Sequence, residues 1–173
     1  MHIIIDGCDG CGKTTLVDRL VKEYKLDKVV MTREGWKDVQ SYEQKCLLDN
    51  VVSDRSFISE YVYSNVYARE SKINPQVFVD LFKKYTSSQI NPWLIIILNG
   101  SVDTIMERVN KRGTDEEIRI EVENKVERYE SVGKRLQLMD NKHVLSLDTT
   151  YLSELGVFNK VKGFIDDYFK FND

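Results

Sequence analysis

Eight consecutive residues near the N-terminus combine glycines, a lysine and a threonine at a spacing that can hold a chain of phosphate groups. The segment 7–14 reads GCDGCGKT and fits the pattern G-x-x-x-x-G-K-[ST]. Its glycines let backbone N–H groups turn inward around phosphate oxygens, while the lysine reaches the β and γ phosphates. A glycine-rich turn that binds nothing is the alternative. The pattern predicts a triphosphate-binding loop, whose ATP-binding residues are Gly7, Asp9, Gly10, Cys11, Gly12, Lys13, Thr14 and Thr15.

Carboxylates and guanidinium groups follow two further apolar runs of the sequence. The pair DR stands at 54–55 and the pair RE at 33–34. Because parallel strands present their carboxyl ends at one edge of a sheet, these side chains are expected beside the loop. The Asp54 carboxylate and the Thr14 hydroxyl then predict a Mg²⁺ site. Arg33 and Arg55 predict a grip on an anionic acceptor, with solvated ion pairs at strand ends as the alternative.

Two of the loop residues are cysteines spaced C-x-x-C, which in isolation is typical of a redox pair or half a zinc site. These are Cys8 and Cys11. A zinc site needs more ligands, and Cys46, His2 and His143 do not have the spacing of metal ligands. Because the phosphate-binding pattern uses the same residues, thiol chemistry is the less favoured interpretation.

The surrounding sequence alternates between strand and helix patterns. Short β-branched runs that are apolar on both faces predict five buried parallel strands, over 2–6, 28–33, 50–55, 93–99 and 142–148. Helical spacing of apolar residues predicts helices over 14–24, 57–67, 75–85, 102–111, 115–139 and 152–169. Asn74 and the pair Thr114 and Glu117 are expected to cap two of them. The pattern predicts an α/β protein with three layers, in which an open, five-stranded parallel sheet is flanked by helices.

Length and charge set limits on the class of protein. The chain has 173 residues, 25 Lys+Arg against 28 Asp+Glu and a net charge of −3, which fits a single domain over residues 1–173. The even distribution of charge disfavours a groove for a nucleic-acid backbone. No leader-like or membrane-spanning apolar stretch occurs, so we expect a cytoplasmic protein that acts on a small molecule without a membrane partner.

Three motifs, in this order and with these local spacings, resemble the thymidylate kinases. That family has a P-loop of the form E-G-x-D-G-x-G-K-T-T, then T-R-E-P, then D-R-x-x-x-S-x-x-A-Y. This chain reads DGCDGCGKTT at 6–15, TRE at 32–34 and DRSFISEYVY at 54–63. The resemblance implies a P-loop kinase fold with a short lid, and an ATP- and Mg²⁺-dependent transfer to a deoxynucleoside monophosphate.

Residue roles follow from the resemblance. Asp9 is expected at the sugar 3′-hydroxyl, Arg33 and Arg55 at the acceptor monophosphate, and Tyr63 at the sugar or base. Glu34 and Ser59 complete the expected acceptor-binding set. The lid, about 108–120, begins with R-x-x-x-R-G. The expected catalytic residues are Lys13, Asp54, Arg55, Arg108 and Arg112.

The loop itself contains no arginine, so the charge of the transferring group is expected to be met by the lid. Arg108, Arg112 and Arg119 would lie within about 40° of one another on an unbroken helix. Gly113 is expected to break that helix. The alternative is an exposed charged helix, in which these arginines pair with residues such as Glu123 four positions away.

The chain departs from the family pattern between the second and third motifs. Only the 19 positions 35–53 separate Glu34 from Asp54, where thymidylate kinases carry a longer segment with a base-recognising arginine. Gly35 replaces the proline of T-R-E-P, and Trp36 follows it. Stacking of Trp36 on a base and packing of Trp36 at the sheet edge both stay open. The preferred base is therefore open.

Other functions remain as alternatives. Deoxynucleoside kinases have a similar P-loop and an E-R-S motif where this chain has DRS at 54–56. A nucleoside 5′-hydroxyl would need a general base, for which Glu34 is the candidate, whereas a monophosphate needs cations instead. Arg33 and Asp9 favour the monophosphate. A polynucleotide or modified-base DNA kinase, a non-catalytic ATP-binding switch and a homodimer formed through 57–67 also stay open, but the sequence has no N-K-x-D motif of a GTPase.

Overall fold

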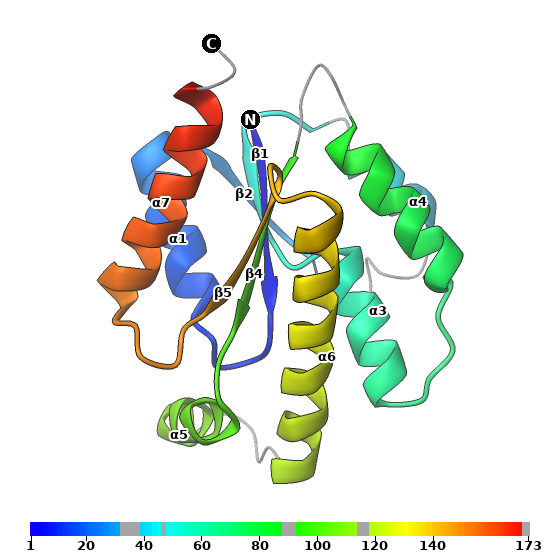
Figure 1. Ribbon diagram of the computed structural model, residues 1–173, viewed down its shortest axis with the longest axis vertical. Helices are drawn as coiled ribbons and strands as arrows, with labels where there is room; N and C mark the ends of the chain where they lie inside the picture. The colour runs from blue at the N-terminus through cyan, green and yellow to red at the C-terminus, as the bar shows by residue number, and fades with distance from the viewer. Residues whose placement is uncertain (32–38, 46–47, 88–92, 114–117, 171–173) are drawn as a thin grey trace.

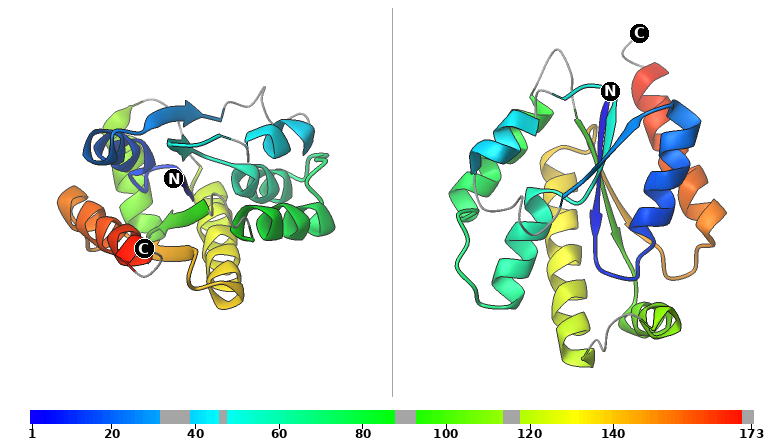
Figure 2. Two further views of the ribbon diagram at one scale, coloured as in Figure 1. Left: turned by 90° about the horizontal axis from the view of Figure 1, so that it is seen from above. Right: turned by 180° about the vertical axis from the view of Figure 1, so that it is seen from behind.

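The molecule is a parallel sheet enclosed between two layers of helices (Figures 1 and 2). The computed structural model describes residues 1–31, 39–45, 48–87, 93–113 and 118–170. The sheet has the strand order β2-β3-β1-β4-β5, and each neighbouring pair is parallel. This agrees with the predicted three-layer α/β fold.

The strands lie where the apolar runs predict them. Their bounds are β1 His2–Gly7, β2 Asp27–Val30, β3 Val51–Asp54, β4 Trp93–Asn99 and β5 Val144–Asp148. Every residue of β1 and β4 is buried, as expected for strands that are apolar on both faces. β2 differs, because it is mostly exposed at the edge of the sheet and ends at Val30 rather than at residue 33.

Five helices begin and end within two residues of their predicted bounds. These are α1 Lys13–Tyr24, α3 Phe57–Val66, α4 Pro75–Thr86, α5 Val102–Arg112 and α7 Glu154–Lys170. The predicted cap of α4 is confirmed, since the Asn74 side chain accepts hydrogen bonds from the N–H groups of Gln76 and Val77, both at 3.0 Å. A short helix, α2 (Val39–Lys45), was not predicted.

The start of α6 corrects a prediction. The helix spans Arg119–Met139 instead of beginning at Asp115, because Ile118 has extended backbone angles and stands at the N-cap position. The proposed capping pair, Thr114 and Glu117, lies outside the described residues. α6 therefore begins without a side-chain cap of its own.

The helices divide between the two faces of the sheet. α1 and α7 cover one face, while α3, α4 and α6 cover the other, and α5 lies beyond the carboxyl ends of β1 and β4 (Figure 1). Most residues of α3 are turned into the protein, including Phe57, Val62 and Tyr63. Within the described ranges, no helix has the length and apolar content needed to cross a membrane.

A small residue lets α6 approach the sheet closely. A Cβ atom added at Gly133 would lie 2.6 Å from Ser146 Oγ and 3.4 Å from Ile97 Cγ2. The backbone of α6 thus packs directly against β4 and β5 at this point.

We predict that Gly133→Ala lowers the free energy of unfolding by about 1 kcal/mol or more, because its methyl group meets Ser146 and Ile97. Gly163→Ala is the matched control, since Gly163 also lies within a helix but faces open space. That control should raise the stability by about 0.5–1 kcal/mol through helix propensity. Urea denaturation of both variants measures the difference, and equal changes would contradict the packing argument.

Candidate active site

The predicted phosphate-binding loop connects the end of β1 to the start of α1. Gly7, Gly10 and Gly12 have positive φ angles of 139°, 77° and 92°. At Gly7 a Cβ atom would lie 2.0 Å from the carbonyl oxygen of Leu98, so no larger residue fits there. The loop therefore has the strand–turn–helix setting that its sequence pattern requires.

A polar pocket of ≈ 170 Å³ opens at the inner side of the loop. The Lys13 side chain is buried there, with Nζ donating a hydrogen bond of 2.8 Å to the carbonyl oxygen of Cys8. Thr14 Oγ1 donates a hydrogen bond of 3.0 Å to Asp54 Oδ2. The predicted site residues that line this pocket are Asp9, Gly10, Gly12, Lys13, Thr14, Asp54, Arg55 and Arg112.

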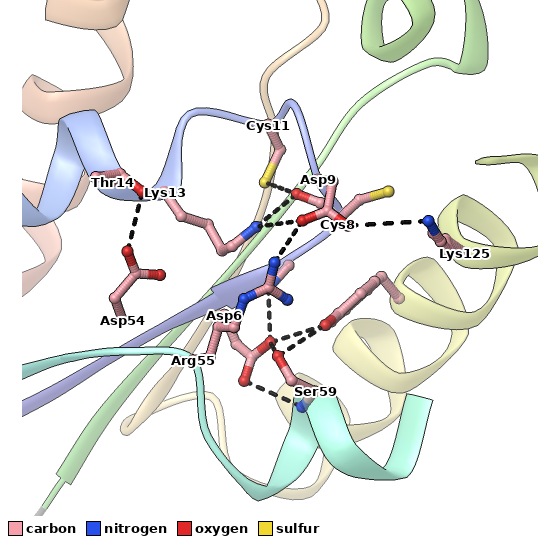
Figure 3. Close-up of polar contacts among 12 residues, drawn as sticks. Asp6, Cys8, Asp9, Cys11, Lys13, Thr14, Asp54, Arg55, Ser59 and Lys125 are labelled. Atoms are coloured by element: carbon pink, nitrogen blue, oxygen red, sulfur yellow. Dashed lines mark hydrogen bonds and ion pairs between the residues drawn. The ribbon is translucent and has the colours of Figure 1, made fainter. Parts of the chain in front are cut away.

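The Asp9 carboxylate lies among several cations of this region (Figure 3). Arg55 and Tyr63 each donate a hydrogen bond to it, and the ammonium groups of Lys13 and Lys125 lie 3.8 Å and 3.9 Å away. Burial opposes the ionised form of Asp9. The charges of Lys13 and Arg55, the Tyr63 hydrogen bond and the charge of Lys125 outweigh it and lower the pKa to about 2.

Arg55 is held by its backbone as well as by its side chain. It has a positive φ of 75°, which is unusual for a residue with a side chain, and its N–H donates a 2.9 Å hydrogen bond to Ile5 O. Its guanidinium carbon lies 5.3 Å from the centre of the Tyr63 ring. The guanidinium is thereby held between the loop and α3.

A second pocket of ≈ 240 Å³, the outer pocket, shares Gly10, Gly12 and Arg112 with the first. Gly10, Cys11, Gly12 and Thr15 form one wall of it, and the loop after β5 together with the first turn of α7 forms another. The residues of this second wall, which the sequence analysis did not single out, are Thr149, Leu152, Glu154 and Val157. The signal that could have found them is the position of the predicted fifth strand, whose carboxyl end reaches the same edge of the sheet.

Of the three lid arginines, two line these pockets. Arg108 donates hydrogen bonds of 2.9 Å to the side chain and to the carbonyl oxygen of Thr149, beside the outer pocket. Arg112 lines both pockets. The left-handed Gly113 ends α5, as expected. The lid arginines therefore do not share one unbroken helix.

Arg119 fits the alternative of an exposed charged helix. It lies 3.0 Å from Glu123, four positions along α6, and 2.9 Å from Asp103 of α5. The side chain is 59% exposed, so the pairs contribute little to stability. They join the N-terminal ends of the two helices.

The cysteines of the loop are buried free thiols. Cys8 is 0% exposed and Cys11 is 2% exposed, and Cys11 Sγ donates a 2.7 Å hydrogen bond to Cys8 O. Burial raises the pKa of Cys8 to about 12 and also raises the pKa of Cys11. Neither is therefore an activated thiol. No metal-ligand cluster of three or more His, Cys, Asp and Glu residues occurs within the described part of the chain.

A buried carboxylate at the end of β1 organises the helices around the pocket. Asp6 accepts hydrogen bonds from Gly7 N at 2.8 Å, Ser56 Oγ at 2.7 Å and Tyr129 OH at 3.0 Å. Both the N–H and the hydroxyl of Ser59 donate to it as well, at 3.2 Å and 2.6 Å. Ser59 corrects an expectation, because its fully buried hydroxyl binds Asp6 and Tyr129 and does not line either pocket.

Two residues of α6 were missed by the sequence analysis. Lys125 and Tyr129 are both buried and both point toward the loop side of the sheet, at Asp9 and Asp6 respectively. They share the inward face of the helix with Val122, Gly133 and Leu136. The helical spacing of these positions was the available signal, since Lys125 is a charged residue in an otherwise uncharged stripe.

The remaining residues predicted for the acceptor side lie outside the residues that the structure describes. They are Arg33, Glu34, Gly35 and Trp36. The third cysteine, Cys46, also lies outside the described residues. Tyr63, by contrast, lies against Asp9 and Arg55.

Known proteins similar to this chain include kinases of nucleotides and nucleosides and, by fold, a gluconokinase from Sinorhizobium meliloti with a TM-score of 0.62 at 12% identity, covering 98% of this chain and 96% of that one. No family model matches. The thymidylate kinase of Campylobacter lari is 23% identical over 96% of this chain and 100% of that protein. The YorR protein from Bacillus subtilis, solved with phosphorylated GDP, has a TM-score of 0.81 at 22% identity, covering 96% of both chains. A deoxyadenosine kinase from M. mycoides with bound dCTP has a TM-score of 0.65 at 16% identity, covering 96% of this chain and 100% of that one.

The strand order, the loop between β1 and α1 and the likeness to these structures define the fold of P-loop kinases. Similarity to thymidylate kinases extends along nearly the whole chain.

We predict that Asp6→Asn lowers the free energy of unfolding by roughly 3 kcal/mol, because its amide group cannot accept all the buried hydrogen bonds that the carboxylate accepts. Tyr129→Phe removes one of these bonds and should cost about 1 kcal/mol. Tyr151→Phe is the control, since Tyr151 is 96% exposed and should not change the stability. Chemical denaturation measures all three, and an Asp6→Asn variant as stable as wild type would contradict the role of this carboxylate.

Proposed function

We propose that the protein transfers the γ-phosphoryl group of ATP to a deoxynucleoside monophosphate. The observation that carries the proposal is the polar pocket, where Lys13 and Thr14 of the loop face Arg55 at the end of β3. The lining of this pocket combines groups that can bind donor phosphates with a guanidinium suited to an acceptor phosphate. The similarity to thymidylate kinases supports this acceptor class.

On the donor side, the triphosphate would lie along the loop and the base would enter the outer pocket. Leu16, Leu152 and Val157 supply apolar surface there, and the Arg108 guanidinium, held by Thr149, supplies a flat charged group. A planar base packs well against such a surface. Residues 1–173 act in this proposal as a single P-loop domain with a lid at about 108–120.

The donor set for Mg²⁺ is a hydroxyl beside a carboxylate. Thr14 Oγ1 and Asp54 Oδ2 lie 3.0 Å apart, and no larger cluster of acidic residues accompanies them in the described ranges. This fits Mg²⁺, which usually keeps several waters and phosphate oxygens and takes only one or two protein ligands. When bound, the ion neutralises charge on the β and γ phosphates.

In the transfer step, an oxygen of the acceptor phosphate forms a bond to the γ-phosphorus as the bond from that phosphorus to the β–γ bridging oxygen breaks. The products are ADP and a deoxynucleoside diphosphate. Lys13 neutralises the transferring group, and Arg112, which lines both pockets, would add charge as the lid closes. Arg55 orients the acceptor oxygen, which is already anionic and needs no general base.

The second candidate is a deoxynucleoside kinase. The deoxyadenosine kinase of M. mycoides shares the fold over its full length. In that case the acceptor is a 5′-hydroxyl, its proton must be removed, and Glu34 is the candidate base. The Arg55 guanidinium, which Asp9 holds in place, favours a monophosphate as the acceptor. A neutral nucleoside would not need a cation at this position.

We predict that Lys13→Ala abolishes phosphoryl transfer, since the transferring group then lacks its buried cation. A coupled assay of ADP release measures this with the four deoxynucleoside monophosphates, the four deoxynucleosides and single-stranded DNA as acceptors. Lys134→Ala is the control, because Lys134 is an exposed lysine of α6. Near-normal turnover by Lys13→Ala, or activity only on DNA, would overturn the proposal.

Replacing Glu34 separates the two candidates. If the acceptor is a monophosphate, Glu34→Gln should lower kcat much less than 10²-fold, because no proton has to be removed. A general base would make the loss about 10²-fold or more. Initial rates at saturating ATP measure kcat for each acceptor, and the larger loss would favour the nucleoside kinase.

A further inference from the structure

One lysine of α6 is buried beside the acceptor wall. The Lys125 side chain is 3% exposed, and the other buried residues of this helix face are Val122, Tyr129, Gly133 and Leu136. Moving an ammonium group out of water is costly unless an opposite charge compensates it. A methionine would fill this position without that cost. The charge of Lys125 therefore has to be explained by what it faces.

Lys125 faces the oxygen of Asp9 that Arg55 does not bind. Its Nζ lies 3.9 Å from Asp9 Oδ2 and 5.5 Å from the centre of the Tyr63 ring. Arg55 binds Oδ1, and Lys13 lies 3.8 Å from that same oxygen. Lys13 and Lys125 thus approach the carboxylate from opposite sides (Figure 3). The loop, the end of β3 and α6 each contribute one cation to this cluster.

The Arg55 guanidinium has two competing anions once an acceptor phosphate arrives. A phosphate monoester carries between one and two negative charges near pH 7, and it needs the guanidinium that Asp9 now holds. With Arg55 turned away, the charges of Lys13 and Lys125 and the Tyr63 hydrogen bond still favour the ionised form of Asp9 and hold its pKa down. The carboxylate therefore stays ionised beside the incoming phosphate, and the cations that remain to offset their repulsion are Lys13 at Oδ1 and Lys125 at Oδ2.

We propose that Lys125 is a positioning residue that makes the acceptor site specific for phosphorylated nucleotides. This inference rests on the proposed function. Lys125 offsets the negative charge of Asp9 while the Arg55 guanidinium moves from Asp9 to the acceptor phosphate. A nucleoside without a phosphate brings no charge and does not require this exchange. The side chain thus favours monophosphates over nucleosides without touching the acceptor.

The test compares Lys125→Met, which keeps the volume and loses the charge, with Lys134→Met on the exposed side of α6. The probes are the four deoxynucleoside 5′-monophosphates, the four deoxynucleosides and ATP, in equilibrium titrations and initial-rate assays. Lys125→Met should raise Kd and KM for the best monophosphate roughly tenfold or more, with a smaller change in kcat. Binding of nucleosides and ATP should stay within about twofold, and Lys134→Met should match wild type.

Two further variants separate charge from packing. Lys125→Arg keeps the charge and should retain the preference for monophosphates. In an Asp9→Asn background, Lys125→Met should have no further effect on monophosphate affinity, because the charge that Lys125 offsets is gone. Thermal unfolding of each variant verifies that it is folded.

Several outcomes overturn the inference. Unchanged monophosphate binding by Lys125→Met would do so, and so would an equal loss for nucleosides and ATP, which indicates a general packing role. A wild-type protein that phosphorylates only nucleosides overturns the proposed function, and this is visible before any variant is made. If the wild-type protein phosphorylates monophosphates and Lys125→Met leaves their Kd and KM unchanged, the inference about Lys125 is overturned while the proposed function stands.

Discussion

The buried carboxylate of Asp6 links the loop after β1 to the helices α3 and α6. It is the last side chain of β1 before the loop, and its partners are the first turn of α3 and the middle of α6. A buried carboxylate is tolerated only when its oxygens are satisfied, so the helices must lie where their hydroxyl groups reach it. The orientation of α3 and α6 relative to the loop therefore depends on this one group.

From that arrangement follows the charge cluster around Asp9. Tyr63 comes from α3 and Lys125 from α6, the two helices that Asp6 holds, while Lys13 and Asp9 come from the loop itself. With Arg55 from the end of β3, four groups converge on the Asp9 carboxylate, which is why its pKa is held so low. The cluster is compact because its members come from elements that already share a buried anchor.

The loop also separates two environments that suit the two parts of a nucleotide. Its inner side faces a pocket of charged and hydroxyl groups, and its outer side faces a pocket with Leu16 and Val157. Gly10 and Gly12 line both, so the backbone of the loop is the wall between them. In the proposed function, the phosphates of the donor occupy the first pocket and its base the second.

The sequence by itself determined the sheet, most helix bounds and the phosphate-binding loop, because these depend on local patterns: apolar runs, helical spacing and glycines that permit positive φ. It also placed Asp54 and Arg55 correctly, since parallel strands end at a common edge. Only the tertiary structure decided that Ser59 serves Asp6, that Lys125 faces Asp9 and that residues 149–157 wall the outer pocket. Those facts depend on which helix faces meet across the sheet, and no local pattern encodes the distance between side chains that lie far apart along the chain.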